Sequence, residues 1–245
     1  MIPRVYISHP LEAGQTVVVD TQAHNYLVRV LRLRVGAGVV LFDGRGQDWP
    51  GQLTSVTPQA TVVLGAMPST PATESPLRVT LVQGVPKGER MEWIIQKWVE
   101  LGGDRLIPLL TQRGVVQLPP ERRQDRQQRW QRIAIEAAEQ CGRSRVPVVE
   151  QPVTWSDLAA CLVDDGSRLL LQERMATPTT LNQIRPQSAV TVLVGPEGGL
   201  TAEEQRMACD SMGFVPVSLG RRVLRTETAA LAAMAAVQLL WGDMA

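Results

Sequence analysis

Residues 192–201 read VLVGPEGGLT and carry the clearest fold signal in the chain. An apolar run of strand type leads directly into a turn with glycine at positions 195, 198 and 199. Thr201 and Glu204 follow with the spacing of a capping box, which predicts that a helix opens there. In open α/β sheets, ligands bind beyond the carboxyl ends of the strands, where glycine lets them approach the backbone closely. Residues 192–201 therefore predict a ligand-binding strand–turn–helix unit; the alternative is a tight turn that needs glycine only for its backbone angles.

Around this unit, residues 77–245 alternate between strand-like and helix-like patterns. One helix opens near residues 87–90, stops at the glycines at 102 and 103, and carries Met91, Ile94, Ile95 and Trp98 on one face. Such alternation predicts an α/β fold with a mostly parallel sheet and helices on both faces. The expected strands are residues 78–83, 105–110, 168–172, 189–194 and 214–219, and the further helices are residues 121–141, 155–163, 201–212 and 226–241.

The first 66 residues have a different, β-rich pattern. Apolar or alternating runs at residues 16–20, 39–42, 48–56 and 60–65 predict short strands separated by turns. One helix interrupts them, with Ala23, Leu27, Val30 and Leu31 at helical spacing. Residues 67–76 hold three prolines in ten positions, which is typical of a linker. We therefore expect a small β-barrel domain, residues 1–70, followed by the α/β domain, residues 71–245.

Composition excludes several classes of protein. With 245 residues, 44% of them hydrophobic, and a formal net charge of +1, the chain can bury a substantial core, unlike an intrinsically disordered chain. No run of about 18 apolar residues predicts a membrane span, and the first residues lack the apolar stretch of a secretory signal. Cys141, Cys161 and Cys209 are far apart and odd in number, so we expect buried, unpaired thiols and no zinc site. The expected compartment is the cytoplasm.

A second candidate site lies in residues 219–231, which read LGRRVLRTETAAL. They follow a predicted strand, bring Arg225 close to Glu227, and run into an alanine-rich helix that Thr226 or Thr228 could cap. The alanines by themselves favour simple close packing. Residues 172–174 (QER) follow another predicted strand, so three strand ends could converge on one pocket. The chain has no GxGxxG after a strand, no GxxxxGK[ST] and no HExxH, which excludes the usual dinucleotide, P-loop and zinc-protease sites.

The basic residues are nearly all arginine, because only Lys87 and Lys97 of the 25 are lysines. Arginine binds phosphate in a bidentate way and stacks on bases, which is compatible with RNA binding, but a GC-rich genome would give the same bias, so composition alone does not decide. A solvated, purely structural surface is the alternative for each basic stretch. The candidate RNA contacts are Arg122, Arg126, Arg129 and Arg143 around the helix at 121–141, His24, Tyr26, Arg29 and Arg32 in the β-rich part, and Lys87 and Arg90, whose role could be helix capping alone.

Residues 195–200 (GPEGGL) together with residues 219–229 (LGRRVLRTETA) resemble the cofactor-binding signature of the SPOUT methyltransferases. Within that class the chain most resembles the ribosomal RNA small subunit methyltransferase E family, which methylates N3 of one uridine in 16S rRNA. Residues 24–32 (HNYLVRVLR), 41–44 (LFDG), 87–102 (KGERMEWIIQKWVELG) and 134–143 (AIEAAEQCGR) agree with this family, so the resemblance spans both expected domains. It implies a PUA-like RNA-binding barrel, an α/β domain with a trefoil knot and cofactor site at about residues 170–231, S-adenosylmethionine as cofactor without a metal, and a homodimer formed through the knotted domain.

The resemblance also implies roles for particular residues. Arg225 is expected to contact the uridine carbonyl oxygens, and Glu197 or Glu227 to orient it or to accept the N3 proton. Gln172 and Glu173 stand where relatives often carry His-Pro, a departure that would leave backbone contacts intact. Two rivals stay open: a SPOUT enzyme that methylates a ribose 2′-hydroxyl, and a non-catalytic RNA-binding assembly factor. The expected cofactor contacts are Leu171, Gln172, Gly195, Pro196, Glu197, Gly198, Gly199, Leu200, Leu219, Gly220, Val223, Leu224, Thr226, Thr228 and Ala229.

Overall fold

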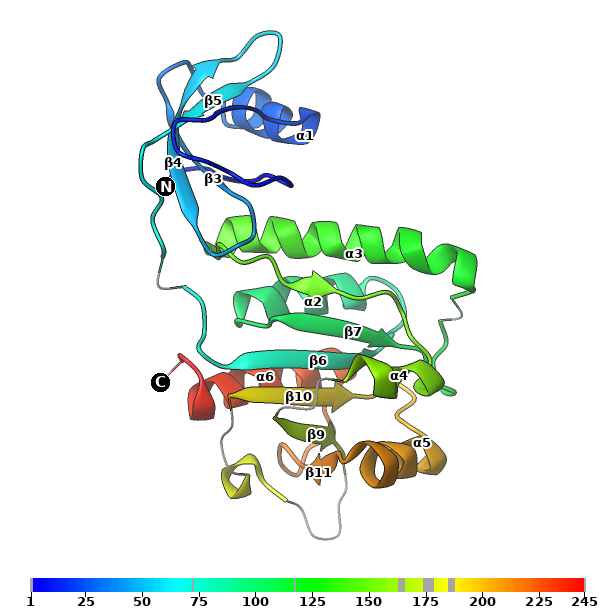
Figure 1. Cartoon of the computed structure of the whole chain (residues 1–245). Coiled ribbons are helices and arrows are strands. Elements are labelled where there is room, and N and C mark those ends of the chain that lie inside the picture. Colours follow the sequence, from blue (N-terminus) through cyan, green and yellow to red (C-terminus); the bar gives the residue numbers. More distant parts are fainter. Residues whose placement is uncertain are drawn as a thin grey trace. The chain divides into compact units, whose positions relative to one another are not determined.

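The computed structural model divides the chain into two compact units (Figure 1). It describes residues 2–71, 73–116, 118–162, 166–173, 179–184 and 188–244. The first unit consists of Met1–Glu74 and Ala138–Val146, and the second of Ser75–Ala137 and Pro147–Ala245. The predicted boundary at residue 70 places residues 138–146 in the second domain. In the structure these residues belong to the first unit instead.

The first unit is built on a five-stranded curled sheet. Its strands are β1 (Arg4–Tyr6), β2 (Thr16–Val18), β3 (Gly38–Phe42), β4 (Asp48–Ser55) and β5 (Thr61–Leu64), in the order β1-β3-β4-β5-β2. Only β1 and β3 pair in parallel, and the other pairs are antiparallel. Leu41, Leu53 and Val62 are fully buried in the core that this sheet encloses. The sheet forms a half-barrel, and β1, a strand of three residues, is missing from the prediction.

The helix of the first unit differs from its prediction. It begins as α1 (Thr21–His24), where the Asp20 carboxylate accepts a hydrogen bond from the Ala23 N–H, and continues as a π-helix, η1 (Asn25–Val30). Ala23 and Leu27 are buried as expected, but Val30 is 67% exposed. The predicted stripe is wrong at Val30 and Leu31, because the wider π-helical turn rotates later residues away from a face set by a period of 3.6.

Residues 138–146 are fixed to the first unit by a buried ionic network. The Arg143 side chain donates to the Glu74 carboxylate through Nε at 3.1 Å and Nη2 at 2.8 Å, and Glu74 also accepts from the Ser144 N–H at 3.1 Å. Arg4 pairs with Asp48, which also accepts a hydrogen bond from Ser144. Arg143 is only 3% exposed. Its predicted RNA contact is therefore wrong: the side chain holds this segment in place.

The second unit contains a six-stranded sheet in which every pair of neighbouring strands is parallel, which confirms the predicted α/β class. The sheet order is β11-β9-β10-β6-β7-β8. Because all strands point the same way, their carboxyl ends meet at one edge. The strands are β6 (Arg78–Gly84), β7 (Arg105–Leu109), β8 (Val148–Val149), β9 (Ser167–Leu171), β10 (Ala189–Val194) and β11 (Val215–Val217).

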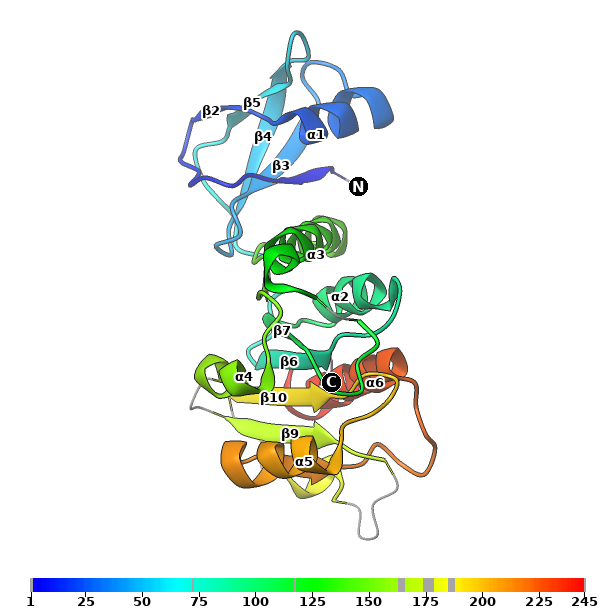
Figure 2. The ribbon, with the colours of Figure 1, turned by 90° about the vertical axis from the view of Figure 1, so that its right-hand side faces the viewer.

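Helices cover both faces of this sheet (Figures 1 and 2). On one face, α2 (Arg90–Glu100) packs against α6 (Thr226–Trp241), which also contacts β6 and β10. On the other, α4 (Trp155–Cys161) and α5 (Ala202–Arg206), which continues as the π-helix η3 (Met207–Ser211), cover a core that includes Leu158, Leu193 and Ala208. The remaining helices are α3 (Pro120–Cys141) and the 3₁₀ helix η2 (Leu181–Gln183). The helix predicted at residues 155–163 corresponds to α4, and its predicted last residue, Val163, lies outside the described residues.

Two further observations concern the chain as a whole. In the described ranges, no helix is both long and apolar enough to cross a membrane. Cys141, Cys161 and Cys209 are each half-buried, so the prediction of buried thiols is wrong. The strand order and pairing do not define the threading of the chain, and the trefoil knot stays a prediction.

Candidate active site

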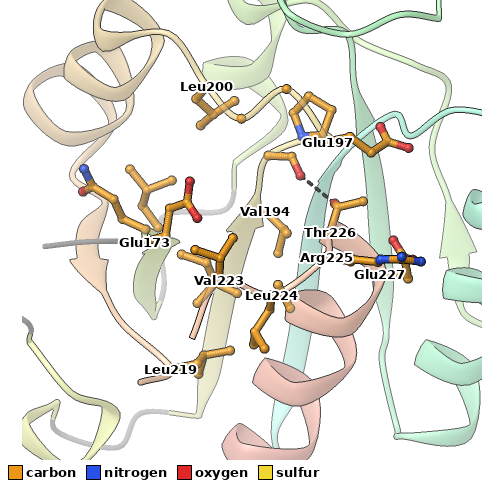
Figure 3. Close-up of a pocket in the computed structure, with 18 of the residues that line it drawn as sticks. Glu173, Val194, Glu197, Leu200, Leu219, Val223, Leu224, Arg225, Thr226 and Glu227 are labelled. Atoms are coloured by element: carbon orange, nitrogen blue, oxygen red, sulfur yellow. Dashed lines mark hydrogen bonds between the residues drawn. The ribbon is translucent and has the colours of Figure 1, made fainter. Parts of the chain in front are cut away.

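A pocket of about 750 Å³ opens at the carboxyl ends of β9, β10 and β11 (Figure 3). The three polar or glycine-rich segments that the sequence singled out do meet there. Thr228 alone among the expected cofactor contacts is not in its lining, and it is exposed in the first turn of α6. The expected residues that line the pocket are Leu171, Gln172, Gly195, Pro196, Glu197, Gly198, Gly199, Leu200, Leu219, Gly220, Val223, Leu224, Arg225, Thr226, Glu227 and Ala229.

The glycine-rich turn (residues 195–200) follows β10 and forms one wall of the pocket. A Cβ on Gly198 would lie 2.9 Å from the carbonyl oxygen of Arg113, so only glycine lets the two backbones approach. Gly199 has a φ of +66°, a left-handed conformation that other residues rarely adopt. The glycines thus serve both the turn's own geometry and its packing, and the backbone facing the pocket carries no side chain at these positions.

A buried hydrogen-bond chain joins this turn to the start of α6. The Gln83 amide donates to the Thr226 hydroxyl at 2.9 Å, and that hydroxyl donates to the Gly195 carbonyl at 2.6 Å (Figure 3). Gln83 is fully buried and Thr226 nearly so. The N-cap of α6 is Arg225, without a side-chain hydrogen bond, so capping by Thr226 or Thr228 is wrong. The Thr226 hydroxyl instead fixes Arg225 and Glu227 beside the pocket.

Arg90, at the start of α2, lies between two carboxylates of the pocket. Its guanidinium pairs with Glu197, and its Nε lies 3.7 Å from Oε1 of Glu227. The Lys87 N–H donates to the Glu197 carboxylate at 3.0 Å. Burial acts to raise the pKa of Glu197, but hydrogen bonds from its own N–H and that of Lys87, together with Arg90, outweigh burial and lower it. Arg90, expected on an RNA surface or in a cap, belongs to the pocket and keeps Glu197 ionised.

Glu227 and Arg225 have the freest reactive groups in the pocket. Oε2 of Glu227 is buried without a hydrogen-bond partner among the described residues. Arg225 is exposed, and its guanidinium has no hydrogen bond or ion pair with any described residue. Glu173, by contrast, lies on the opposite side of the pocket from these two residues (Figure 3). The apolar side chains of Val194, Val223 and Leu224 lie between them, with Leu200 above and Leu219 below in this view (Figure 3).

Several lining residues escape the sequence argument. Arg113 comes from the loop after β7, and Gln205 from α5, where it accepts a hydrogen bond from the Gln172 side chain at 3.1 Å. Neither has a local sequence signal, because only the tertiary fold brings these elements to the pocket. Arg174 lies outside the described residues. The other lining residues outside the expected contacts belong to the same three segments or to the strands that lead into them: Leu170, Glu173, Val194, Val217, Ser218 and Arg222.

The remaining candidate RNA contacts lie outside the pocket lining. In the first unit, Tyr26, Arg29 and Arg32 are exposed, but the His24 ring accepts a hydrogen bond from the Ala60 N–H at 3.0 Å and so supports the fold. In the second unit, Lys87 and Arg122 are exposed. Arg129 pairs with Glu92 at 2.7 Å, and the Arg126 guanidinium lies 5.8 Å from the centre of the Trp130 ring.

Comparisons with known proteins agree with this site. The RNA methyltransferase domain family matches residues 73–238, and the RNA methyltransferase PUA domain family matches residues 19–64. Ribosomal RNA small subunit methyltransferase E of Synechocystis is 38% identical, over 92% of this chain and 73% of that protein. Its namesake in Bacillus subtilis is 32% identical over 95% of each. The chain belongs to the ribosomal RNA small subunit methyltransferase E family.

Solved structures in and around this family have the same fold. Ribosomal RNA small subunit methyltransferase E from Neisseria gonorrhoeae, bound to S-adenosyl methionine, has a TM-score of 0.91 and 38% identity over the whole of both chains. A putative methyltransferase from Legionella pneumophila, in complex with the bound cofactor SAM, has a TM-score of 0.92 and 34% identity, again over the whole of both chains. These matches extend through both units.

Proposed function

We propose that this enzyme transfers the methyl group of S-adenosylmethionine to N3 of one uridine in 16S rRNA. The observation that carries the proposal is that Arg225 and Glu227 line a pocket built mainly from glycine backbone and apolar side chains. Relatives at 38% identity include one solved with S-adenosyl methionine bound. The pocket volume, about 750 Å³, falls in the range of small-molecule sites.

The pocket fits S-adenosylmethionine by its chemistry. Val194, Leu200 and Leu224 offer apolar surface to an adenine ring, and the glycine-rich turn exposes backbone N–H and C=O groups for its edge and for the ribose. Such a mixture of apolar walls and a few polar groups is typical of nucleoside pockets. When bound, the cofactor supplies a methyl group on a positively charged sulfur. The residues of the chain then have to position the uridine and handle its proton.

Arg225 and Glu227 have the chemistry that methylation of N3 requires. The uridine N3 carries an imide proton and is a poor nucleophile until that proton leaves. Arg225, unpaired within the described residues, can donate to a carbonyl oxygen next to N3 and stabilise the negative charge that develops there. The N3–C bond forms as the S–C bond breaks, the N3 proton passes to a carboxylate, and S-adenosylhomocysteine leaves.

Glu227 suits the role of proton acceptor better than Glu197. The carboxylate of Glu197 is occupied by the Lys87 N–H and by Arg90, and its pKa is lowered, which makes it a weaker base. Glu227 keeps one oxygen free of hydrogen bonds. We therefore assign proton transfer to Glu227, and to Glu197 the role of holding Arg90 beside it.

The rest of the chain provides surfaces for RNA. We assign phosphate contacts to Arg122 and Arg129 of α3, which are exposed, and to the half-buried Arg126. In the PUA-like unit we assign RNA contacts to Tyr26, Arg29 and Arg32. A base-paired uridine has its N3 occupied, so the target has to be unpaired or flipped out. By resemblance, the second unit is knotted and forms a homodimer in the cytoplasm, for which Leu239 and Leu240, 57% and 42% exposed at the end of α6, offer apolar surface.

Nucleoside analysis of the methylated product tests this proposal. The purified chain is incubated with methyl-labelled S-adenosylmethionine and either small ribosomal subunits or naked 16S rRNA from a strain that lacks the modification. We expect labelled 3-methyluridine, at one position. Label on a ribose 2′-hydroxyl would show that the ribose, and not N3, is the target. If the chain neither bound the cofactor nor transferred label to RNA, an enzymatic role would be contradicted.

A further inference from the structure

Two arginines that line the pocket have no role in the proposed mechanism, Arg113 and Arg222, and of these only Arg113 has hydrogen bonds to the described residues of the pocket. Arg113 lies in the loop after β7 and lines the pocket beside the glycine-rich turn. Its Nη1 lies 3.4 Å from the carbonyl oxygens of both Gly198 and Leu200. These two long contacts orient the guanidinium and leave Nε and Nη2 without a partner among the described residues.

A buried carboxylate fixes the loop that carries Arg113. Glu204 is fully buried, and its Oε1 accepts hydrogen bonds from the Gln112 N–H at 2.8 Å and from the Trp155 ring N–H at 2.7 Å. Its Oε2 accepts from the Thr201 N–H at 2.7 Å. One side chain thus joins the loop after β7, the start of α4 and the end of the glycine-rich turn. A capping box needs only the Thr201 contact, so the bond to Gln112 is additional.

The loop after β7 packs tightly against the glycine-rich turn. A Cβ on Gly198 would lie 3.0 Å from the Cβ of Arg113 as well as 2.9 Å from its carbonyl oxygen. Glu204 therefore fixes the backbone just before Arg113, and Gly198 lets that backbone pack against the glycine-rich turn. The exposed Arg113 side chain starts from this fixed backbone and is oriented by its two contacts to the turn. A preorganised arginine loses little freedom when it binds a ligand.

We infer that Arg113 binds an oxyanion of the ligands of this pocket, and that Glu204 is the residue that positions it. This inference rests on the proposed function. Two oxyanions enter such a site: the carboxylate of the amino-acid part of S-adenosylmethionine, and the phosphate next to the target uridine. An arginine fork suits both, through paired N–H groups. Of the other cations of the pocket, Arg90 already pairs with Glu197, and Arg225 is assigned to the base. Arg222 is exposed, and no hydrogen bond to a described residue orients it.

Two ligands that differ in the amino-acid group separate the carboxylate from the phosphate. S-adenosylhomocysteine has the carboxylate, whereas methylthioadenosine lacks the amino-acid part. If Arg113 binds the carboxylate, Arg113→Gln weakens S-adenosylhomocysteine about tenfold in calorimetry and leaves methylthioadenosine unchanged. If it binds the phosphate, both ligands bind as before, the KM for RNA rises, and the slope of log affinity against log salt falls by about one. Arg206→Gln, an exposed arginine of α5 outside the pocket lining, is the matched control.

Glu204 is tested through its coupling to Arg113. Glu204→Gln keeps a residue type that capping boxes accept, so the helix start is preserved. We expect it to reproduce part of the Arg113→Gln defect, with the same selectivity between ligands, and to add almost nothing in the double variant. Full additivity of the two changes would overturn the positioning role, since independent sites add.

The remaining outcomes are distinct. Equal loss of both nucleoside ligands in Arg113→Gln, or no change in either ligand and in RNA, would overturn the oxyanion site while leaving the methyltransferase function intact. Failure of the unaltered chain to bind S-adenosylhomocysteine would contradict the proposed function itself, and the inference with it.

Discussion

The two segments that face each other across the pocket are held very differently. The glycine-rich turn is tied down by Thr226 on its first carbonyl, by Lys87 and Arg90 on Glu197, and by Glu204 at its end. The arginine-rich loop (residues 219–225) follows β11, and among the described residues its only hydrogen bonds before Arg225 join Gly220 to Ser218. Val223 within it is 55% exposed.

This difference suggests a division of labour. Backbone groups that are already fixed can bind a cofactor with little loss of conformational entropy. Exposed apolar side chains of the arginine-rich loop, such as Val223, would be buried when they pack on the ligand, which stabilises the complex. We expect the glycine-rich turn to be a preformed wall, and the arginine-rich loop to be completed by the cofactor and the uridine. The predictions below test each side of this comparison.

The largest effect is expected at Glu227, just beyond the arginine-rich loop. Glu227→Gln removes the proposed proton acceptor with little change of shape, so kcat should fall about 10²–10⁴-fold, the usual contribution of a general base. Glu197→Gln is the matched control in the preformed wall and should retain more activity. Single-turnover methylation measures both, and a greater loss in Glu197→Gln would reverse the assignment.

Arg225→Ala should lower kcat by about 10²–10³-fold, as expected when one donor to a developing oxyanion is removed. Arg225 is exposed and without partners in the described part of the chain, so stability and binding of S-adenosylhomocysteine should change by no more than a few-fold. Arg221→Gln, exposed and outside the pocket lining, is the control. Parallel loss of ligand binding and activity would place Arg225 in the cofactor site.

A substitution at Gly84, which packs against Pro196, should displace the glycine-rich turn. A Cβ there would lie 2.6 Å from both N and Cδ of Pro196, atoms that have no room to move. Gly84→Ala should destabilise the protein by about 1–3 kcal/mol, the cost of overpacking, and weaken S-adenosylhomocysteine. Gly38→Ala, where a Cβ meets nothing within 4 Å, is the control. If the two variants unfolded at the same temperature, the turn would be able to move away from the added Cβ at little cost, against this prediction.

A substitution in the arginine-rich loop should weaken ligand binding without changing the stability of the protein. Val223→Ala removes two methyl groups that are largely exposed in the free protein, so the free energy of unfolding should hardly change. If Val223 packs on the cofactor, S-adenosylhomocysteine should bind about fivefold more weakly in calorimetry. Unchanged affinity would remove this residue from the proposed cofactor contacts.

The smallest effect concerns pH and Glu197. Its pKa is lowered from an ordinary value of 4.5 despite burial, which acts to raise it, because its own N–H, the Lys87 N–H and Arg90 stabilise the charged form. A lowered pKa in the folded state stabilises the protein above the unfolded pKa, and this stability is lost as the pH falls through the folded value. The difference in unfolding free energy between the unaltered chain and Glu197→Gln should therefore be largest near neutrality and shrink below pH 4.5. A difference independent of pH would contradict the contacts of Glu197.

Much of this architecture is predictable because local pattern and tertiary structure agree. Strand β10, the glycine-rich turn and the capping box at Thr201 follow from short-range rules, and α6 begins where its sequence suggests. Parallel pairing places the three strand ends at the same edge of the sheet, and the strand order β11-β9-β10 makes them neighbours there. The family resemblance adds the cofactor and the target, which no residue pattern specifies.

The failures have physical causes. The π-helical turn at Asn25–Val30 breaks the period of 3.6 on which the stripe at Val30 was based. Arg143 looks like a surface arginine in the sequence, because its carboxylate partner Glu74 lies 69 positions away along the chain. Arg90 and Arg113 reach the pocket from elements far away in sequence, so their roles depend on the sheet order β10-β6-β7.

The central claim is that the cofactor occupies this pocket between one preformed wall and one wall that it completes. Crystal structures of the chain with and without S-adenosylhomocysteine test it most directly. We predict that the ligand lies at the carboxyl ends of β9, β10 and β11, that the backbone of residues 195–200 moves by less than about 1 Å, and that Val223 and Leu224 become buried against it. A ligand bound elsewhere, or a rearranged glycine-rich turn beside an unchanged arginine-rich loop, would contradict the account.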